Sequence, residues 1–433
     1  MKSETMINVF WFRRDLRLDD NTALSEALAA GLPVLPVFIL DQNITGELPR
    51  NDARVTFIYK TLSEIDLALK RYGSSLLLLA GDPVKTWEKL TDEYKINAVF
   101  INKDYEPYAV QRDDSVETLL KTKGIKLKRF RDQVIFEEKE ILKPDGKPYG
   151  VFTPYRNRWM KELGQEKGRI ASRAQDLPGN FHKQTFRFPA IEETGFEENP
   201  QKVRPSDLST VPVYHKYRDI PAADRTSYLS PHLRFGTVSI RKVAATALAQ
   251  NLIFLNELIW REFFMQILFN YPDVVTENYR SVYDNIEWRN EEGEFLRWCN
   301  GETGYPMVDA GMRQLNSTGY MHNRVRMITA GFLCKHLLID WRWGEAYFAL
   351  KLLDYELSSN NGNWQWAAGT GCDAAPYFRI FNPEAQQKKF DPENEYVRKW
   401  AGDFNKPGYP AKMVDHDLAR RRALQVYKAG LKR

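Results

Sequence analysis

The chain has 433 residues, 43% of them hydrophobic, so it is long enough for two or more hydrophobic cores. Its 62 basic and 57 acidic residues leave a formal net charge of +5, which is a weak indication of a nucleic-acid partner. Three widely spaced cysteines argue against both a zinc site and a disulfide framework. No run of 18 apolar residues and no signal-peptide pattern occurs, so we expect a cytoplasmic protein without a membrane span.

Short apolar runs alternate with amphipathic stretches through the first 136 residues. The predicted strands are Ile7–Phe12, Val34–Leu40, Leu76–Leu79, Ala98–Ile101 and, more weakly, Val134–Phe136. Stretches of helical period lie between them, at Ala23–Ala30, Val55–Lys70 and Val84–Tyr94. This alternation predicts a parallel, doubly wound α/β sheet, which binds ligands at the carboxyl ends of its strands. The turn after the first strand lacks GxGxxG, which disfavours a dehydrogenase-like dinucleotide site there.

The character of the sequence changes twice after that region. Residues 137–205 are rich in Lys, Glu, Pro and Gly and are predicted to form a long connector. Residues 206–433 carry mainly helical patterns, at Ile240–Leu252, Leu255–Leu268, Gly311–Asn316, Arg324–Leu338 and Gly344–Leu353. Eight of the 11 tryptophans lie between Trp260 and Trp400. We therefore predict an α/β domain over 1–136, a connector over 137–205 and an all-α domain over 206–433.

The segment NELIWREFF, at residues 256–264, has the composition of a ligand-facing helix. On a helix Glu257, Trp260 and Arg261 share one face. An acid, a base and a ring on an otherwise apolar helix suit a pocket for a planar ligand with polar edges. The alternative is an ion pair between Glu257 and Arg261 beside a tryptophan of the core.

The segment MHNRVRM, at residues 321–327, contains residue types that can hydrogen-bond to base edges and to phosphates. Asn323 and Met327, four positions apart, share a helix face. Asparagine can read a base edge, and arginine can bind phosphate through two hydrogen bonds. A solvated basic helix face is the alternative, which explains Arg324 well but Asn323 beside Met327 poorly.

Two further segments contain polar residues beside predicted helices. Ser358–Gly362 is predicted to form a polar turn before Trp364 and Trp366, which would point in nearly opposite directions on a helix, one toward a cavity and one toward the core. Thr226, Ser227 and Ser230 precede a helix start predicted near Pro231. Hydroxyls at a helix N-terminus are typical of a phosphate site, with an ordinary helix cap as the alternative.

Together these segments resemble the cryptochrome/photolyase family, and most closely its cyclobutane pyrimidine dimer photolyases. FWFRRDLRLDDNTAL at residues 10–24 resembles the family's opening strand and loop, and FTPYRNRW at 152–159 resembles its connector. The resemblance covers almost the whole chain. It implies a carbon–carbon lyase that repairs pyrimidine dimers in DNA by light-driven electron transfer from reduced FAD to the flipped-out lesion, with a helical FAD-binding domain at the C-terminus.

The resemblance also implies the residues that contact FAD. Contacts with the phosphates would come from Tyr214, Thr226, Ser227, Tyr228, Leu229 and Ser230. Contacts with the ribose, the adenine and the isoalloxazine would come from Trp260, Arg326, Asp354, Glu356 and Asn360. Arg326 and Asp354 would pair beside the flavin, and Asn360 would lie near its N5. Glu356 stands where the family often has Asp.

Lesion and electron-transfer residues are implied in the same way. Residues facing the lesion would be Glu257, Trp260, Asn323, Met327 and Trp366, with Arg218, Arg324 and Arg379 on the flanking phosphates. Trp364, Trp341 and Trp288 would form the inner, middle and outer positions of an electron wire. We expect a monomer that binds DNA with pyrimidine dimers, associated with the nucleoid in a bacterium, and no metal.

Other members of the family fit the sequence less well. The (6-4) photolyases carry histidines where this chain has Asn323 and Met327, and signalling cryptochromes usually have a long C-terminal extension. A single-strand-specific enzyme fits the MHNRVRM stretch less well. Folate-using photolyases have Asn-Glu and Cys-Lys pairs where this chain has Tyr108-Ala109 and Val274-Val275. Residues 104–114 are more similar to members that use a flavin or deazaflavin, so a second antenna chromophore is possible, and its identity is not predicted.

Overall fold

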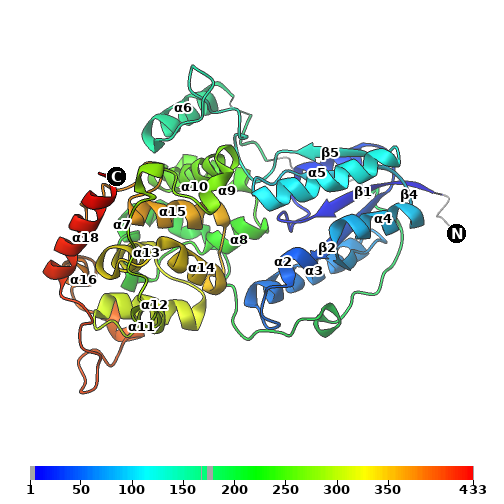
Figure 1. Cartoon of the computed structure of the whole chain (residues 1–433). Helices are drawn as coiled ribbons and strands as arrows, with labels where there is room; N and C mark the ends of the chain where they lie inside the picture. The colour runs from blue at the N-terminus through cyan, green and yellow to red at the C-terminus, as the bar shows by residue number, and fades with distance from the viewer. Residues whose placement is uncertain (1–4, 167, 173–178, 433) are drawn as a thin grey trace. The chain divides into compact units, whose positions relative to one another are not determined.

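The computed structural model describes residues 5–166, 168–172 and 179–432, which form two compact units (Figure 1). The first unit runs to Glu140 and includes Lys161–Ser206 and Tyr228–Ala249. The second contains Ile141–Met160, Asp207–Ser227 and the chain from Gln250 onward. The predicted boundaries at residues 136 and 205 stay predictions. Within the described residues no helix is long and apolar enough to cross a membrane.

A five-stranded parallel sheet forms the centre of the first unit. Its strands are β1 (Met6–Phe12), β2 (Val34–Asp41), β3 (Leu77–Gly81), β4 (Lys95–Asn102) and β5 (Lys126–Phe130), in the order β3-β2-β1-β4-β5. The main helices between them are α1 (Thr22–Ala29), α3 (Ala53–Lys70), α4 (Pro83–Glu93) and α5 (Pro107–Thr122), with the short α2 (Gln42–Thr45). Every pairing is parallel because each strand returns through a helical crossover.

Alternation of side chains along β1 places one core on each face of this sheet. Phe10 and Phe12 pack with residues of α1 and α3, whereas Val9 and Trp11 pack with residues of α4 and α5. Successive side chains of a strand point to opposite faces, so an apolar strand of this kind must be covered on both. The doubly wound α/β fold expected from the sequence is confirmed.

The fifth strand is not where the sequence suggested it. Val134–Phe136 lies buried but outside the strands, and β5 is Lys126–Phe130 instead. This strand has the sequence KLKRF and lies at the edge of the sheet. An edge strand tolerates lysine and arginine because part of its surface meets solvent, so it gives a weak hydrophobic signal.

Helices make up most of the second unit. The ones that build its centre are α10 (Leu252–Asn270), α12 (Pro306–Thr318), α13 (Asn323–Gly331), α14 (Trp341–Lys351) and α15 (Leu357–Ala368). Around them lie α7 (Tyr214–Tyr217), α11 (Glu292–Asn300), α16 (Pro383–Phe390), α17 (Glu395–Trp400) and α18 (His416–Gly430), and α13 continues as a π-helix over Phe332–Leu337. Helix α15 packs against α10, α13 and α14. Figure 1 shows α13, α14 and α15 beside one another.

Of three further helices, one lies in the predicted connector and two lie in the region predicted as the helical domain. They are α6 (Phe152–Gln165), α8 (Leu229–Phe235) and α9 (Ile240–Gln250). The sequence had indicated no helix at α6. Helix α8 starts at Leu229, two residues before the predicted start, and Tyr228 before it has a left-handed backbone with φ of 51°.

The polar turn predicted at Ser358–Gly362 is wrong, because these residues form the first turns of α15. Short polar side chains favour turns when they compete for their own backbone hydrogen bonds. Here the Asn361 amide instead donates to the Val274 carbonyl at 2.8 Å. At Gly362 a Cβ would lie 2.2 Å from the Phe264 ring, so glycine is required by close helix packing. Tertiary contacts therefore override the local preference.

Candidate functional site

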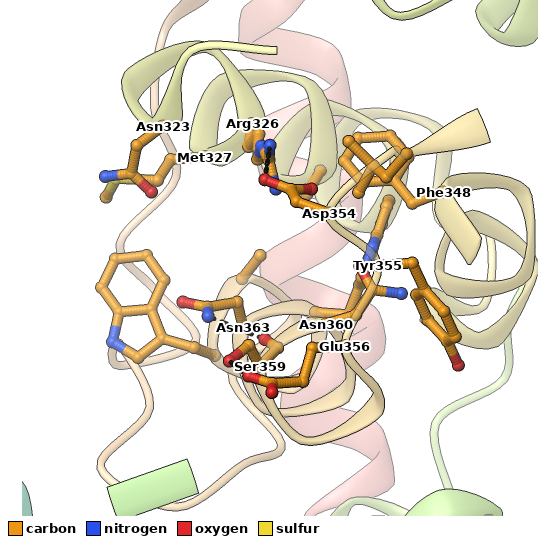
Figure 2. A pocket seen from close by; sticks show the side chains of 15 residues that line it. Asn323, Arg326, Met327, Phe348, Asp354, Tyr355, Glu356, Ser359, Asn360 and Asn363 are labelled. Atoms are coloured by element: carbon orange, nitrogen blue, oxygen red, sulfur yellow. Dashed lines mark hydrogen bonds and ion pairs between the residues drawn. The ribbon is translucent and has the colours of Figure 1, made fainter. Parts of the chain in front are cut away.

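A pocket opens between α13, α14 and α15 in the second unit (Figure 2). The empty space within it is about 610 Å³, part of it open to solvent. Predicted site residues that line it are Asn323, Arg326, Met327, Asp354, Glu356, Asn360, Trp364 and Trp366. Residues implied for the flavin and residues implied for the lesion thus share one cavity.

Arg326 and Asp354 form an ion pair at the wall of this pocket. The Arg326 guanidinium donates to Asp354 Oδ2 at 2.8 Å and to the Met321 carbonyl at 2.8 Å. The Asp354 side chain is 5% exposed, and its Oδ1 has no hydrogen-bond partner in the described part of the chain. A buried carboxylate oxygen without a donor is costly, so it indicates a ligand that presents an N–H or O–H group. The polar edge of an isoalloxazine ring meets this requirement.

The Asn360 side chain is held in a fixed orientation by Glu345 of α14. Its Nδ2 donates to the Glu345 carbonyl at 3.1 Å and to Glu345 Oε1 at 2.8 Å. Burial raises the pKa of Glu345 above its usual value. Because both contacts use the amide nitrogen, the rotation of the Asn360 side chain is set before any ligand binds.

The three tryptophans of the implied wire all contact one core cluster. Trp364 is 2% exposed and meets the Phe348 and Trp298 rings edge-on, with centroids 4.9 Å and 6.1 Å away. Trp341 is buried and donates from Nε1 to Asn278 Oδ1 at 2.9 Å. Trp288 is partly buried against the same cluster.

The acidic and basic residues of α10 pair with other helices. Glu257 accepts from Arg218 at 2.9 Å, and Arg261 lies 3.3 Å from a carboxylate oxygen of Glu356. The suggested pair between Glu257 and Arg261 is therefore wrong. Two charges one turn apart on a helix interact weakly, so partners brought in by tertiary packing prevail.

The two implied lesion contacts of α10, Glu257 and Trp260, do not line this pocket. The Trp260 ring stacks on Phe152, with centroids 3.7 Å apart and planes inclined by 8°. Phe152 belongs to the FTPYRNRW segment, which the resemblance gave no role at the site. The aromatic first residue of that motif, Phe152, is the feature of the sequence that could have pointed to this contact.

The implied phosphate-binding arginines have partners within the protein. Arg324 donates to Asp219 at 2.5 Å and lies over the Phe390 ring at 4.4 Å. Arg379 lies 5.7 Å from the centre of the Phe381 ring. Asp219 is a further residue that the sequence alone did not single out.

The residues implied for the FAD phosphates fall into two groups. Tyr214, Thr226 and Ser227 belong to the second unit, whereas Tyr228, Leu229 and Ser230 open α8 in the first. None of the six is among the residues that line the pocket described above. Tyr214 is held edge-on by the Phe254 ring at 5.0 Å.

Two lining residues were missed because the start of α15 was interpreted as a turn. Ser359 and Asn363 line the pocket together with Trp366. Their spacing of i, i+4 and i+7 is that of one helix face, and Figure 2 shows Ser359 and Asn363 on the α15 side of the cavity. A helical interpretation of residues 357–368 would have found both.

Several charged side chains lie near the carboxyl ends of the strands in the first unit, the part of the chain to which the resemblance assigns a possible second chromophore. Arg14 pairs with Asp104 at 3.0 Å, and the Tyr108 hydroxyl donates to Asp41 at 2.7 Å. Burial and the Asp41 carboxylate raise the pKa of Tyr108 to about 12. The identity of a second chromophore stays open.

Known proteins resemble this chain over almost its whole length. The model of the DNA photolyase family matches residues 8–173, and that of the FAD binding domain of DNA photolyase matches residues 254–407. A deoxyribodipyrimidine photo-lyase from Synechococcus is 35% identical, over 97% of this chain and 96% of the relative.

Solved structures extend the likeness to the fold. A class III photolyase from Agrobacterium tumefaciens has a TM-score of 0.84 at 32% identity, covering 100% of this chain and 99% of its own. An archaeal photolyase from Sulfolobus tokodaii, described with two FAD molecules, has a TM-score of 0.85 at 36% identity, covering 98% and 100%. The chain belongs to the DNA photolyase family, and its second unit contains that family's FAD-binding domain.

Proposed function

We propose that the protein repairs cyclobutane pyrimidine dimers in DNA by light-driven electron transfer. One observation carries the proposal: residues suited to a flavin, Arg326 and Asp354, and residues suited to a base, Asn323 and Met327, line a single pocket. Electron transfer to a lesion requires such proximity. The names of the relatives, deoxyribodipyrimidine photo-lyases, support the same activity.

The flavin-facing residues have separate tasks in this proposal. Bound FAD, when reduced and excited by light, supplies the electron that opens the dimer. The Asp354 carboxylate accepts an N–H of the ring through its unpartnered Oδ1, while Arg326 holds the other oxygen, Oδ2. Asn360 presents its preoriented amide near the reacting edge. These groups orient the ring and require little rearrangement during the reaction.

The lesion-facing residues hold a flipped-out dimer. Asn323 donates to and accepts from base edges, and Met327 and Trp366 form an apolar wall of the pocket. Glu257 and Trp260 extend the lesion contacts from α10. Arg218, Arg324 and Arg379 bind the flanking phosphates.

Three tryptophans recharge the flavin in this scheme. An indole is readily oxidised for a side chain, so stepwise transfer through Trp288, Trp341 and Trp364 moves an electron from the protein surface toward the pocket. Trp288 is the most exposed of the three and Trp364 lines the pocket, which is the order that the transfer needs.

The decisive experiment illuminates reduced protein with an oligonucleotide that contains one thymine dimer. We expect one FAD per chain and loss of the dimer under blue light, with none in the dark. Parallel oligonucleotides with a (6-4) lesion should stay unrepaired. Repair of that lesion alone, or of neither, overturns the proposal.

A further inference from the structure

An ion pair joins Arg218, which the resemblance assigns to a DNA phosphate, and Glu257, which it assigns to the lesion. Arg218 caps the C-terminus of α7, and its NH1 lies 2.9 Å from Glu257 Oε1 of α10. The two side chains are 28% and 34% exposed, so an incoming ligand can reach both. The Arg218 guanidinium also lies over the Tyr214 ring at 5.2 Å.

The surrounding charges make Arg218 the counterion of Glu257. Asp219, beside Arg218, is held by Arg324 at 2.5 Å, and Arg261 on the same helix as Glu257 is directed to Glu356. The neighbouring phenol of Tyr214 is neutral at physiological pH, because burial and the Glu257 carboxylate raise its pKa above the usual value.

The environment of Glu257 already disfavours its charge. Burial raises the pKa of its carboxyl above the ordinary value, although the Arg218 guanidinium acts in the opposite direction, and the Asp219 carboxylate adds a smaller increase. Removing Arg218 from this set would therefore leave a carboxyl that binds a proton more readily.

The inference rests on the proposed function. We propose that Arg218 exchanges partners when lesion-containing DNA binds: it leaves Glu257 for a DNA phosphate, and Glu257 then takes one proton from solvent and donates a hydrogen bond to a carbonyl oxygen of the dimer. An ionised carboxylate has no proton to donate and would repel that carbonyl oxygen. Phosphate binding and lesion reading thereby become one linked event.

Such an exchange couples DNA affinity to pH. The carboxyl has a higher proton affinity in the complex than in the free protein, so binding takes up a proton. Affinity for the lesion is then greatest at low pH. It falls by about tenfold for each pH unit between the pKa of Glu257 in the free protein and its higher pKa in the complex. Above that interval it becomes constant again.

The test measures proton uptake when FAD-loaded protein binds a thymine-dimer oligonucleotide in the dark. Calorimetry in two buffers of different ionisation enthalpy gives the number of protons taken up, and fluorescence anisotropy gives the affinity from pH 6 to 9. The parent should take up a proton, to a limit of one per complex. The Glu257→Gln variant should take up none and should bind with a flat pH profile.

Two arginine variants separate counterion loss from phosphate loss. Arg218→Gln should lower the log–log salt slope of binding by about one unit and should also reduce proton uptake, because Glu257 without its counterion binds a proton more readily in the free protein. Arg324→Gln is the matched control: its partner is Asp219, which affects the pKa of Glu257 less than Arg218 does, so the variant should lower the salt dependence equally but keep most of the proton uptake. Bound FAD and melting temperature show whether each variant is folded.

Two outcomes overturn the exchange: no proton uptake by the parent, or equal uptake by parent and Glu257→Gln. Illuminating the same complexes tests the proposed function separately. Dimers that are split without proton uptake overturn the exchange alone, whereas an absence of splitting overturns the proposed function.

Discussion

Replacing Gly344 by alanine tests how the pocket tryptophan is held. An added Cβ would lie 2.1 Å and 2.4 Å from two ring carbons of Trp364, and 2.6 Å from Leu333 Cδ2. Carbon atoms in contact are normally about 3.5–4.0 Å apart, so the ring must move by roughly 1.5 Å. Trp364 is 2% exposed and is enclosed by the Phe348 and Trp298 rings, which leave it little freedom.

The expected cost follows from two opposing contributions. Overpacking a core costs about 1–3 kcal/mol, and three contacts below 3 Å favour the upper part of that range. Alanine gains about 1 kcal/mol over glycine inside a helix such as α14. The net loss is about 2 kcal/mol, which lowers the melting temperature of a unit of this size by about 4–8 °C.

The measurement compares melting temperature, bound FAD per chain and the rate of FAD photoreduction. Because Trp364 lines the pocket, Gly344→Ala should reduce all three. Gly331→Ala is the control, since its Cβ would meet Phe381 at an ordinary 3.8 Å and should leave stability unchanged or slightly raised. A Gly344→Ala protein that melts and photoreduces like the parent would refute the argument that this close helix contact positions the ring.

Three further predictions concern the wire, the flavin and the lesion. Trp341→Phe should block photoreduction of oxidised FAD but leave repair by pre-reduced protein nearly unchanged; normal photoreduction would contradict the wire. Asp354→Asn should weaken FAD binding about ten- to a hundredfold, because Oδ1 loses its charge as an acceptor. Flavin fluorescence measures this affinity, and an unchanged value would show that Asp354 does not contact the cofactor. Glu257→Ala should lower the repair yield per absorbed photon with FAD still bound, whereas an altered melting temperature with unaltered yield would indicate a structural role.

Local periodicity in the sequence was enough to predict much of the architecture. The strands Ile7–Phe12 and Val34–Leu40 and the helix Val55–Lys70 were predicted to within a few residues. Asn323 and Met327 do share a face of α13 and do line the pocket. Side-chain direction along a helix or strand repeats with a fixed period, so such relations need no knowledge of the rest of the fold.

Only tertiary structure decided the features that depend on partners distant in sequence. The Ser358–Gly362 segment became helical because Phe264 and Val274 reach it from elsewhere. Glu257 pairs with Arg218, thirty-nine positions earlier, and not with its helix neighbour. The orphaned Oδ1 of Asp354 is likewise invisible in a sequence. Burial and ion pairing depend on which elements pack together, and the free energy of a buried polar group is set by those neighbours more strongly than by its own residue type.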